Sequence, residues 1–201
     1  MKKIVLITTL LLAFTSIYAQ NAAQARKVLD KTAAVVGNKN GASANFTLNN
    51  KYGKTNGTIA IKGNKFVAST PDATMWFDGK TQWTYMKKNE EVNVTSPDVA
   101  QQQNMNPYTF ISLYRNGYTL AIKTVGSNYL VHLTATSKNR PVKEMYILIN
   151  KSTYKPSQVK MRQTNGWTTI SIRNFQAKTL TDAAFRFNAK DYPHAEVIDL
   201  R

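Results

Sequence analysis

The sequence predicts an α+β fold that is mainly β, built as an antiparallel meander of about ten or eleven strands. From Ala44 onward, apolar and polar residues alternate with a period of two in one run after another, which is typical of strands with one apolar face. Short turn signals such as Asp78-Gly79 and Asn165-Gly166 separate these runs. Most connections are therefore expected to be hairpins.

The N-terminus has the pattern of a secretory signal peptide. Lys2 and Lys3 precede a short apolar run from Ile4 to Phe14, and the small residue Ala19 follows. The run is too short to span a bilayer comfortably. We expect cleavage after Ala19, which leaves residues 20–201 as a single exported domain in the periplasm.

A helix is predicted directly after the expected cleavage site. Ala22, Ala25, Val28, Leu29 and Val36 are spaced along one face of a helix, and Gly37 is a typical C-terminal stop. The strands that follow are indicated by these alternating residues: Ala44, Phe46 and Leu48; Ile59 and Ile61; Trp83 and Tyr85; Val92 and Val94; Tyr118, Leu120 and Ile122; Tyr129, Val131 and Leu133; Met145, Ile147 and Ile149; Val159 and Met161; Ile170 and Ile172; Phe185 and Phe187.

One stretch interrupts the strands. Helix starts are predicted at Ser96-Pro97-Asp98 and at Asn106-Pro107, and residues 107–115 fit one or two short helices with a strongly apolar face. The sheet has one apolar face and few helical residues to cover it. The pattern leaves two architectures open: a closed barrel filled by its own side chains, and a half-barrel with helices across its mouth.

Composition excludes several classes of protein. The chain has no cysteine, which excludes a disulfide scaffold, a thiolate zinc site, a cysteine nucleophile and a lipid-modified N-terminal cysteine. It carries 27 lysine and arginine residues against 11 acidic ones. Export argues against a nucleic-acid partner, so we expect the basic residues to dock against acidic partner surfaces or anionic lipid headgroups.

The sequence predicts no enzyme, no cofactor and no metal site. His132 and His194 lack an acidic or histidine partner at metal-ligand spacing, and both are expected at the surface. The adjacent pair Glu90-Glu91 is expected at the polar end of a hairpin. There is no nucleophile elbow and no phosphate-binding glycine loop.

Four ordered blocks resemble one known family, that of the outer-membrane lipoprotein carriers (LolA). The most specific block is D-G-K-T-x-W-x-Y from Asp78 to Tyr85, followed by the V-x-V strand at Val92 and Val94. The sequence from Asn106 to Ile111 is similar to the helical segment of that family. The ending Phe185-Arg186-Phe187-Asn188, with Val197-Ile198-Asp199, is similar to its C-terminus.

The resemblance implies an incomplete antiparallel β-barrel with a helical lid over a hydrophobic cavity. It also implies a monomeric periplasmic carrier that takes acylated lipoproteins from an inner-membrane lipoprotein-releasing transporter to an outer-membrane acceptor. The alternative is a lipid- or lipoprotein-sensing module on the same scaffold. The family's best-studied branch latches its lid with an arginine just after the second strand. The corresponding stretch here is residues 61–66, where Lys62 and Lys65 stand instead.

Under this resemblance the inward alternating positions line the acyl-chain cavity. The expected lining residues are Phe46, Leu48, Ile59, Ile61, Phe66, Met75, Phe77, Trp83, Tyr85, Val92, Val94, Ile147, Ile149, Val159, Met161, Ile170 and Ile172. The expected lid residues are Phe110, Leu113 and Tyr114.

Overall fold

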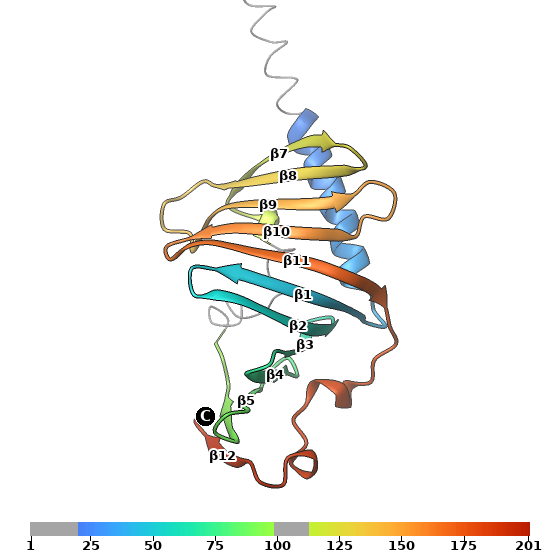
Figure 1. Ribbon diagram of the computed structural model, residues 1–201. Coiled ribbons are helices and arrows are strands. Elements are labelled where there is room, and N and C mark those ends of the chain that lie inside the picture. The colour runs from blue at the N-terminus through green and yellow to red at the C-terminus, as the bar shows by residue number, and fades with distance from the viewer. Residues whose placement is uncertain (1–19, 99–112) are drawn as a thin grey trace, which may run out of the picture.

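A computed structural model describes residues 20–98 and 113–201 of the chain (Figure 1). The predicted signal peptide lies outside these residues, as do residues 99–112, which contain most of the predicted lid segment. Of that segment, the structure describes the 3-10 turn η2 (Leu113–Arg115). Within the described residues, no helix combines the length and the apolar character that a bilayer span requires.

The N-terminal helix covers residues 20–36, as the sequence predicted. Ala25, Val28 and Leu29 are buried along one face of it. The helix ends where Gly37 donates its N–H to the carbonyl oxygen of Ala33 at 2.7 Å. It lies across one face of the sheet (Figure 1), so its apolar side closes part of that face.

Twelve strands form one sheet in the described chain, with the order β12-β6-β5-β4-β3-β2-β1-β11-β10-β9-β8-β7. Their bounds are β1 (Ala42–Asn50), β2 (Gly53–Lys62), β3 (Lys65–Ser69), β4 (Ala73–Phe77), β5 (Gln82–Met86), β6 (Glu91–Thr95), β7 (Tyr118–Val125), β8 (Asn128–Ala135), β9 (Val142–Asn150), β10 (Pro156–Gln163), β11 (Gly166–Ala177) and β12 (Glu196–Asp199). β7 and β12 are the two edges, so the sheet is an incomplete barrel rather than a closed one.

The C-terminal part differs from the prediction in three ways. The sheet has twelve strands rather than ten or eleven. The residues Phe185 and Phe187 do not form a strand, because the segment turns through η3 (Asp182–Phe185) and η4 (Ala189–Asp191). The last strand is β12, and it pairs in parallel with β6, so the sheet is not antiparallel throughout. The chain returns to β6 along the outside of the sheet, and a return of this kind makes a parallel pair possible.

We call the face that carries the helix the inner face. Cross-strand partners share a face, and the registers place thirteen of the predicted lining residues on one face. Val28 and Leu29 of the helix pack in one cluster with Ile147, Ile149 and other residues of this face. The opposite, outer face therefore carries the intervening residues of each strand.

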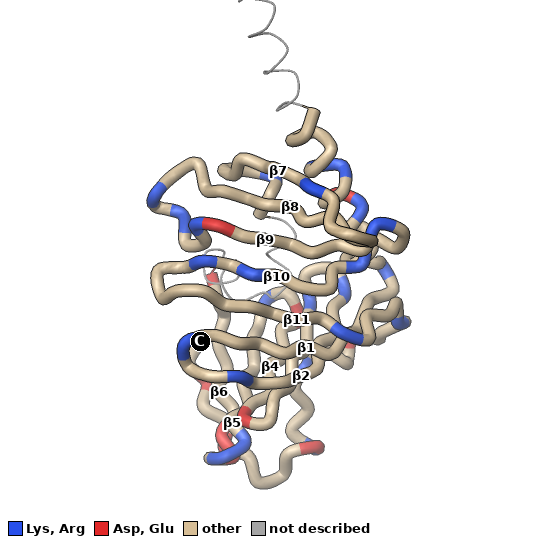
Figure 2. Tube along the Cα trace, turned by 45° about the horizontal axis from the view of Figure 1, so that its top comes forward, with Lys and Arg blue, Asp and Glu red and all other residues tan. Residues whose placement is uncertain are grey.

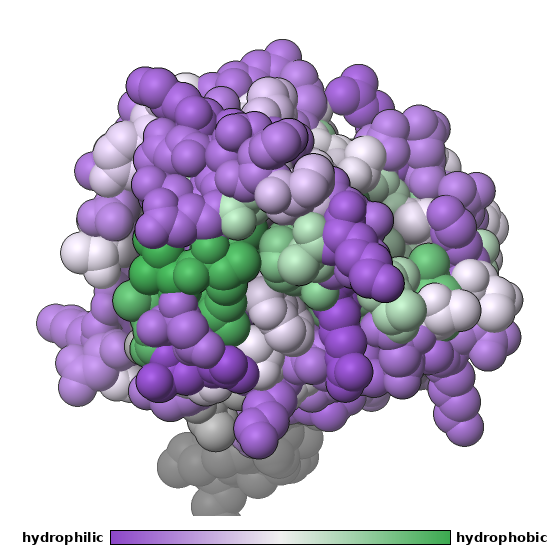
Figure 3. Space-filling model, turned by 90° about the horizontal axis from the view of Figure 1, so that it is seen from below, coloured by the Kyte–Doolittle hydropathy of each residue, from purple (hydrophilic) through white to green (hydrophobic). Residues whose placement is uncertain are grey.

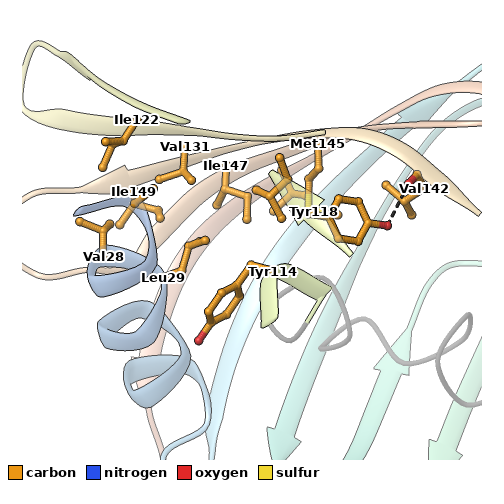
Figure 4. Packing of buried hydrophobic residues seen from close by; sticks show 13 residues of the cluster. Val28, Leu29, Tyr114, Tyr118, Ile122, Val131, Val142, Met145, Ile147 and Ile149 are labelled. Carbon is orange, nitrogen blue, oxygen red and sulfur yellow. Dashed lines mark hydrogen bonds between the residues drawn. The ribbon is translucent and has the colours of Figure 1, made fainter. Parts of the chain in front are cut away.

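Two apolar clusters fill separate parts of the inner face. In the larger cluster the helix and η2 pack against β7–β10, and Val131, Leu133, Met145, Ile149 and Val159 are all fully buried there (Figure 4). The smaller cluster joins Val36 at the end of the helix to Ile61, Phe66 and Phe77. β1 and β11 lie between β2 of the smaller cluster and β10 of the larger one.

Candidate functional site

The inner face continues past the helix as a strip of apolar side chains that are only partly buried. We call this the open strip. It consists of Phe46, Leu48, Ile59, Met75, Met161, Ile170 and Ile172. Met161, Ile170 and Ile172 pack at the margin of the larger cluster, and Ile59 and Met75 at the margin of the smaller one. The strip therefore bridges the two clusters.

Cross-strand pairing aligns the strip. Phe46 is opposite Ile172, and Leu48 is opposite Ile170, across the β1–β11 pair. Phe46 is also opposite Gly57 on the other side of β1. A Cβ atom at Gly57 would lie 2.4 Å from the Phe46 ring and 2.4 Å from the Ser69 carbonyl oxygen. Gly57 thus leaves room for the Phe46 ring beside β2, a close approach that a larger residue would prevent.

Near the β5–β6–β12 end of the sheet, the exposed large apolar side chains are Met86, Val197 and Leu200. Seen from below, the surface has an apolar area bordered by hydrophilic residues (Figure 3). Exposed contiguous apolar surface on a folded protein usually marks a site of contact with another molecule. An apolar surface of this kind can remove hydrocarbon from water.

Six of the predicted lining residues belong to the buried cores rather than to the open strip. Ile61, Phe66, Phe77, Ile147, Ile149 and Val159 share the inner face, and each is less than a tenth exposed. They pack against the helix and against one another. These six residues therefore stabilise the fold on both sides of the open strip, and the strip residues lie between them.

Four predicted lining residues lie on the outer face instead. Phe77 is opposite Gln82 and Met75 is opposite Thr84, so Gln82 and Thr84 occupy the inner face of β5. Trp83, Tyr85, Val92 and Val94 consequently lie on the opposite face from the other thirteen. Alternation within one strand shows which residues share a face of that strand. It does not show which of the two faces is continuous with the inner face of the neighbouring strand, because the register between the strands decides this.

The outer face of β4–β6 is apolar because the C-terminal segment covers it. The Trp76 ring lies 5.7 Å from Phe187 and 5.6 Å from Tyr192, measured between ring centroids. Tyr85 lies 4.6 Å from Tyr192. These contacts explain the aromatic residues of this region as packing for the C-terminal segment. They join positions more than a hundred residues apart, so no local pattern could have indicated them.

A pocket of about 770 Å³ opens between β4 and this C-terminal segment. Trp76, Phe187 and Tyr192 line it together with Asp182 and Asp191. No sequence pattern indicated this pocket. The three rings pack against one another, and the pocket lies on the outer face, away from the open strip.

Lys62 and Lys65, which stand in the stretch where the resemblance implied a latch, contact the C-terminal segment. The Asp182 carboxylate forms ion pairs with Lys65 Nζ at 2.8 Å and with Lys62 Nζ at 3.1 Å. Lys62 Nζ also donates a hydrogen bond to the Leu180 carbonyl oxygen. These contacts, with that from Lys65 the strongest, lower the pKa of Asp182. Within the described chain, both lysines therefore hold η3 against β2 and β3.

Of the predicted lid residues, Phe110 lies outside the described chain. Leu113 and Tyr114 of η2 belong to the larger cluster, next to the helix. The Tyr114 hydroxyl donates to the Asp30 carboxylate at 2.5 Å. Burial, and then this hydrogen bond, raise the pKa of Tyr114. Tyr114 thus joins η2 to the helix (Figure 4).

The described residues hold no group of three or more His, Asp or Glu side chains placed to bind a metal. His132 lies on the outer face, as expected, since Val131 and Leu133 are buried on the inner one. It does have an acidic partner, because Glu144 of the neighbouring strand lies 3.0 Å from its Nε2. That contact arises from strand pairing, and spacing along the chain does not indicate it.

Comparison with known proteins agrees with this architecture. The family model described as outer membrane lipoprotein carrier protein LolA matches residues 15–165. The chain belongs to this family. Its membership rests on a match over most of the sequence, and it confirms the resemblance of the sequence blocks.

Solved structures resemble this chain at low sequence identity, and the first of those that follow has the same fold. An uncharacterized conserved protein from Thermus thermophilus has a TM-score of 0.60 and 12% identity, over 88% of this chain and 99% of that one. A LolA superfamily protein from Nitrosomonas europaea has a TM-score of 0.45 and 10% identity, over 81% and 97% of the two chains. LprF from Mycobacterium bovis has a TM-score of 0.46 and 8% identity, over 81% and 98%. No curated protein matches the sequence significantly.

Proposed function

We propose that this chain is a periplasmic carrier that binds the acyl chains of lipoproteins along the open strip and takes them from the inner to the outer membrane. The observation that supports it most is the apolar inner face, which continues beyond the helix with partly buried side chains. Family membership supports the same function. In this proposal the protein acts without catalysis, cofactor or metal.

The physical requirement for such a carrier is simple. Each buried methylene contributes about 0.8 kcal/mol, so a lipoprotein with several acyl chains does not cross water unaided. The strip offers aliphatic and aromatic side chains from β10, β11, β1, β2 and β4. Its two methionines, Met75 and Met161, are unbranched and polarizable, which suits chains of varied shape. The proposed partners are acylated lipoproteins, an inner-membrane releasing transporter and an outer-membrane acceptor, with the carrier monomeric.

Binding of a dansyl-labelled long-chain fatty acid tests the site. The double variant Ile170→Ala/Ile172→Ala removes methylenes from the strip, and we expect its affinity to fall roughly tenfold or more. The control is Leu148→Ala, because Leu148 is also partly buried but lies on the outer face of β9. The far-ultraviolet circular dichroism of all three proteins should be the same. Unchanged affinity in the double variant, or an equal loss in the control, would contradict the proposed site.

Depletion in cells tests the transport step separately. If the chain is a carrier, its depletion should leave lipoproteins in the inner membrane, as fractionation would detect. Normal lipoprotein sorting with altered transcription would instead indicate the sensing module.

A further inference from the structure

The charges of this protein divide between two parts of the fold. Residues 20–64 and 113–178 form the helix, β1, β2, η2 and β7–β11, and they contain 18 lysine and arginine residues against two acidic ones, Asp30 and Glu144. Residues 65–98 and 179–201 form the rest of the described chain, with seven basic and nine acidic residues. Figure 2 shows this division, with basic positions spread over β7–β11. The net charge of the protein is therefore a property of one part.

The outer face of the basic part carries a row of aromatic rings flanked by cations. We call it the basic-aromatic patch, and it consists of His132, Tyr146, Lys160, Arg162 and Trp167. The His132 ring stacks on Tyr146 with centroids 4.3 Å apart, and Tyr146 lies 6.1 Å from Trp167. Lys160 Nζ lies 4.6 Å and Arg162 Cζ 5.9 Å from the Trp167 ring centroid. Trp167 is 38% exposed.

The one carboxylate beside this patch is already paired. Glu144 accepts hydrogen bonds from the Tyr146 hydroxyl at 2.6 Å and from Arg162 Nε at 3.1 Å, and it contacts His132 Nε2 at 3.0 Å. The bond from Tyr146, followed by that from His132, lowers the pKa of Glu144. Its single charge cannot offset both Lys160 and Arg162, so the patch is positive overall.

We propose that the basic-aromatic patch docks the protein on a membrane surface that contains anionic lipid headgroups. Cations near such a surface are attracted within about one Debye length, and each Lys or Arg contributes about a fivefold increase in affinity. Indole and phenol rings occupy the interface between headgroups and hydrocarbon, because they are apolar with a polar edge. The patch combines both kinds of side chain on one exposed sheet face.

The distribution of charge favours a membrane over an acidic protein as the partner. The remaining basic residues of this part are spread over the helix, the strands and the loops rather than gathered in one groove (Figure 2). A specific protein interface needs charges in register with those of its partner. A broad cationic surface around a tryptophan suits a planar anionic layer, because such a layer does not require individual charges at fixed positions.

Vesicle co-sedimentation tests this proposal without any lipoprotein, so its outcome does not depend on the carrier function. The chain from residue 20 onward should bind phosphatidylcholine vesicles that contain phosphatidylglycerol at low ionic strength. It should bind vesicles of phosphatidylcholine alone much more weakly, and molar salt should abolish the difference. Lys160→Gln/Arg162→Gln should weaken binding roughly 25-fold, whereas Arg162→Lys should retain most of it.

Two controls locate the surface. Lys80→Gln/Lys88→Gln removes the same charge from exposed positions of the acidic part and should leave binding unchanged. Tryptophan fluorescence should shift to the blue on addition of anionic vesicles, and Trp167→Phe should abolish the shift whereas Trp83→Phe should retain it. Absence of binding to anionic vesicles at low salt, binding to an acidic protein instead, or an equal loss in the lysine control would overturn the proposal.

Discussion

The inner face under the helix and the open strip have the same sequence pattern but different burial. Ile147 and Ile149 alternate in β9 and are 1% and 0% exposed. Ile170 and Ile172 alternate in β11 on the same face, and both are only partly buried. The two pairs are even linked through β10, because Val159 is opposite Ile147 on one side and Ile170 on the other. The helix and η2 belong to the cluster around the first pair.

This difference shows that a period of two identifies an apolar face without showing its use. A helix of 17 residues, 20–36, covers only part of a twelve-stranded sheet. Where it lies, apolar residues stabilise the fold. Beyond it, the same residue types remain available to a ligand. The two regions should therefore respond differently to the same substitution.

The largest expected effect is a difference in unfolding free energy between the same substitution in the two regions. Ile149→Ala should lower the free energy of unfolding by about 3 kcal/mol, since it leaves a cavity in the packed cluster. Ile172→Ala should cost clearly less, because its side chain is already in part exposed. Urea denaturation monitored by circular dichroism measures both. Equal losses of unfolding free energy in the two variants would show that the strip residues are packed as tightly as the core, and would contradict the difference between the two regions.

Gly57→Val should disturb the strip by overpacking. The new side chain would begin 2.4 Å from the Phe46 ring and from the Ser69 carbonyl oxygen, and the backbone contact cannot relax through a rotamer change. We expect a loss of about 2 kcal/mol in the free energy of unfolding. Gly63→Ala is a control for backbone strain without overpacking, since Gly63 has a positive φ of 61° but no neighbouring atom within 4 Å. A neutral Gly57→Val would show that Phe46 does not lie over β2.

The smallest expected effect concerns the link between η2 and the helix. Tyr114→Phe removes the hydrogen bond to Asp30 and should cost about 1–2 kcal/mol at neutral pH. The pKa of Tyr114 is raised above its usual value near 10, so the folded state holds its proton where the unfolded state loses it. Stability should therefore fall as pH rises above 10, and less steeply in Tyr114→Phe. Identical slopes in thermal melts from pH 9 to 11 would contradict the buried phenol.

Much of the fold follows from local pattern. The helix at 20–36 and the strands of β7–β11 were predicted because amphipathic periods of 3.6 and two are intrinsic to the chain. The prediction was wrong at Phe185 and Phe187, where the alternation belongs to a segment that packs on Trp76 and β3 rather than to a strand. β12 was missed as a strand since its four residues pair in parallel with β6, a contact distant in sequence.

The candidate site was predicted less completely. The thirteen residues of the inner face were found because each lies at an alternating position of its strand. Trp83, Tyr85, Val92 and Val94 were placed on the wrong face, because the relation between neighbouring strands depends on the register across the turn at Asp78-Gly79. The pairing of His132 with Glu144 likewise depends on a register, that of β8 against β9.

The sequence by itself determined which residues are apolar on one side of each strand, that a helix precedes them, and that the chain carries a large excess of positive charge. These properties are local or additive, so they can be read along the chain. Only the tertiary structure decided which part of the inner face the helix covers, where the C-terminal segment packs, and that the basic residues gather in one part of the fold. Those outcomes depend on contacts between residues distant in sequence, which strand register and helix placement create.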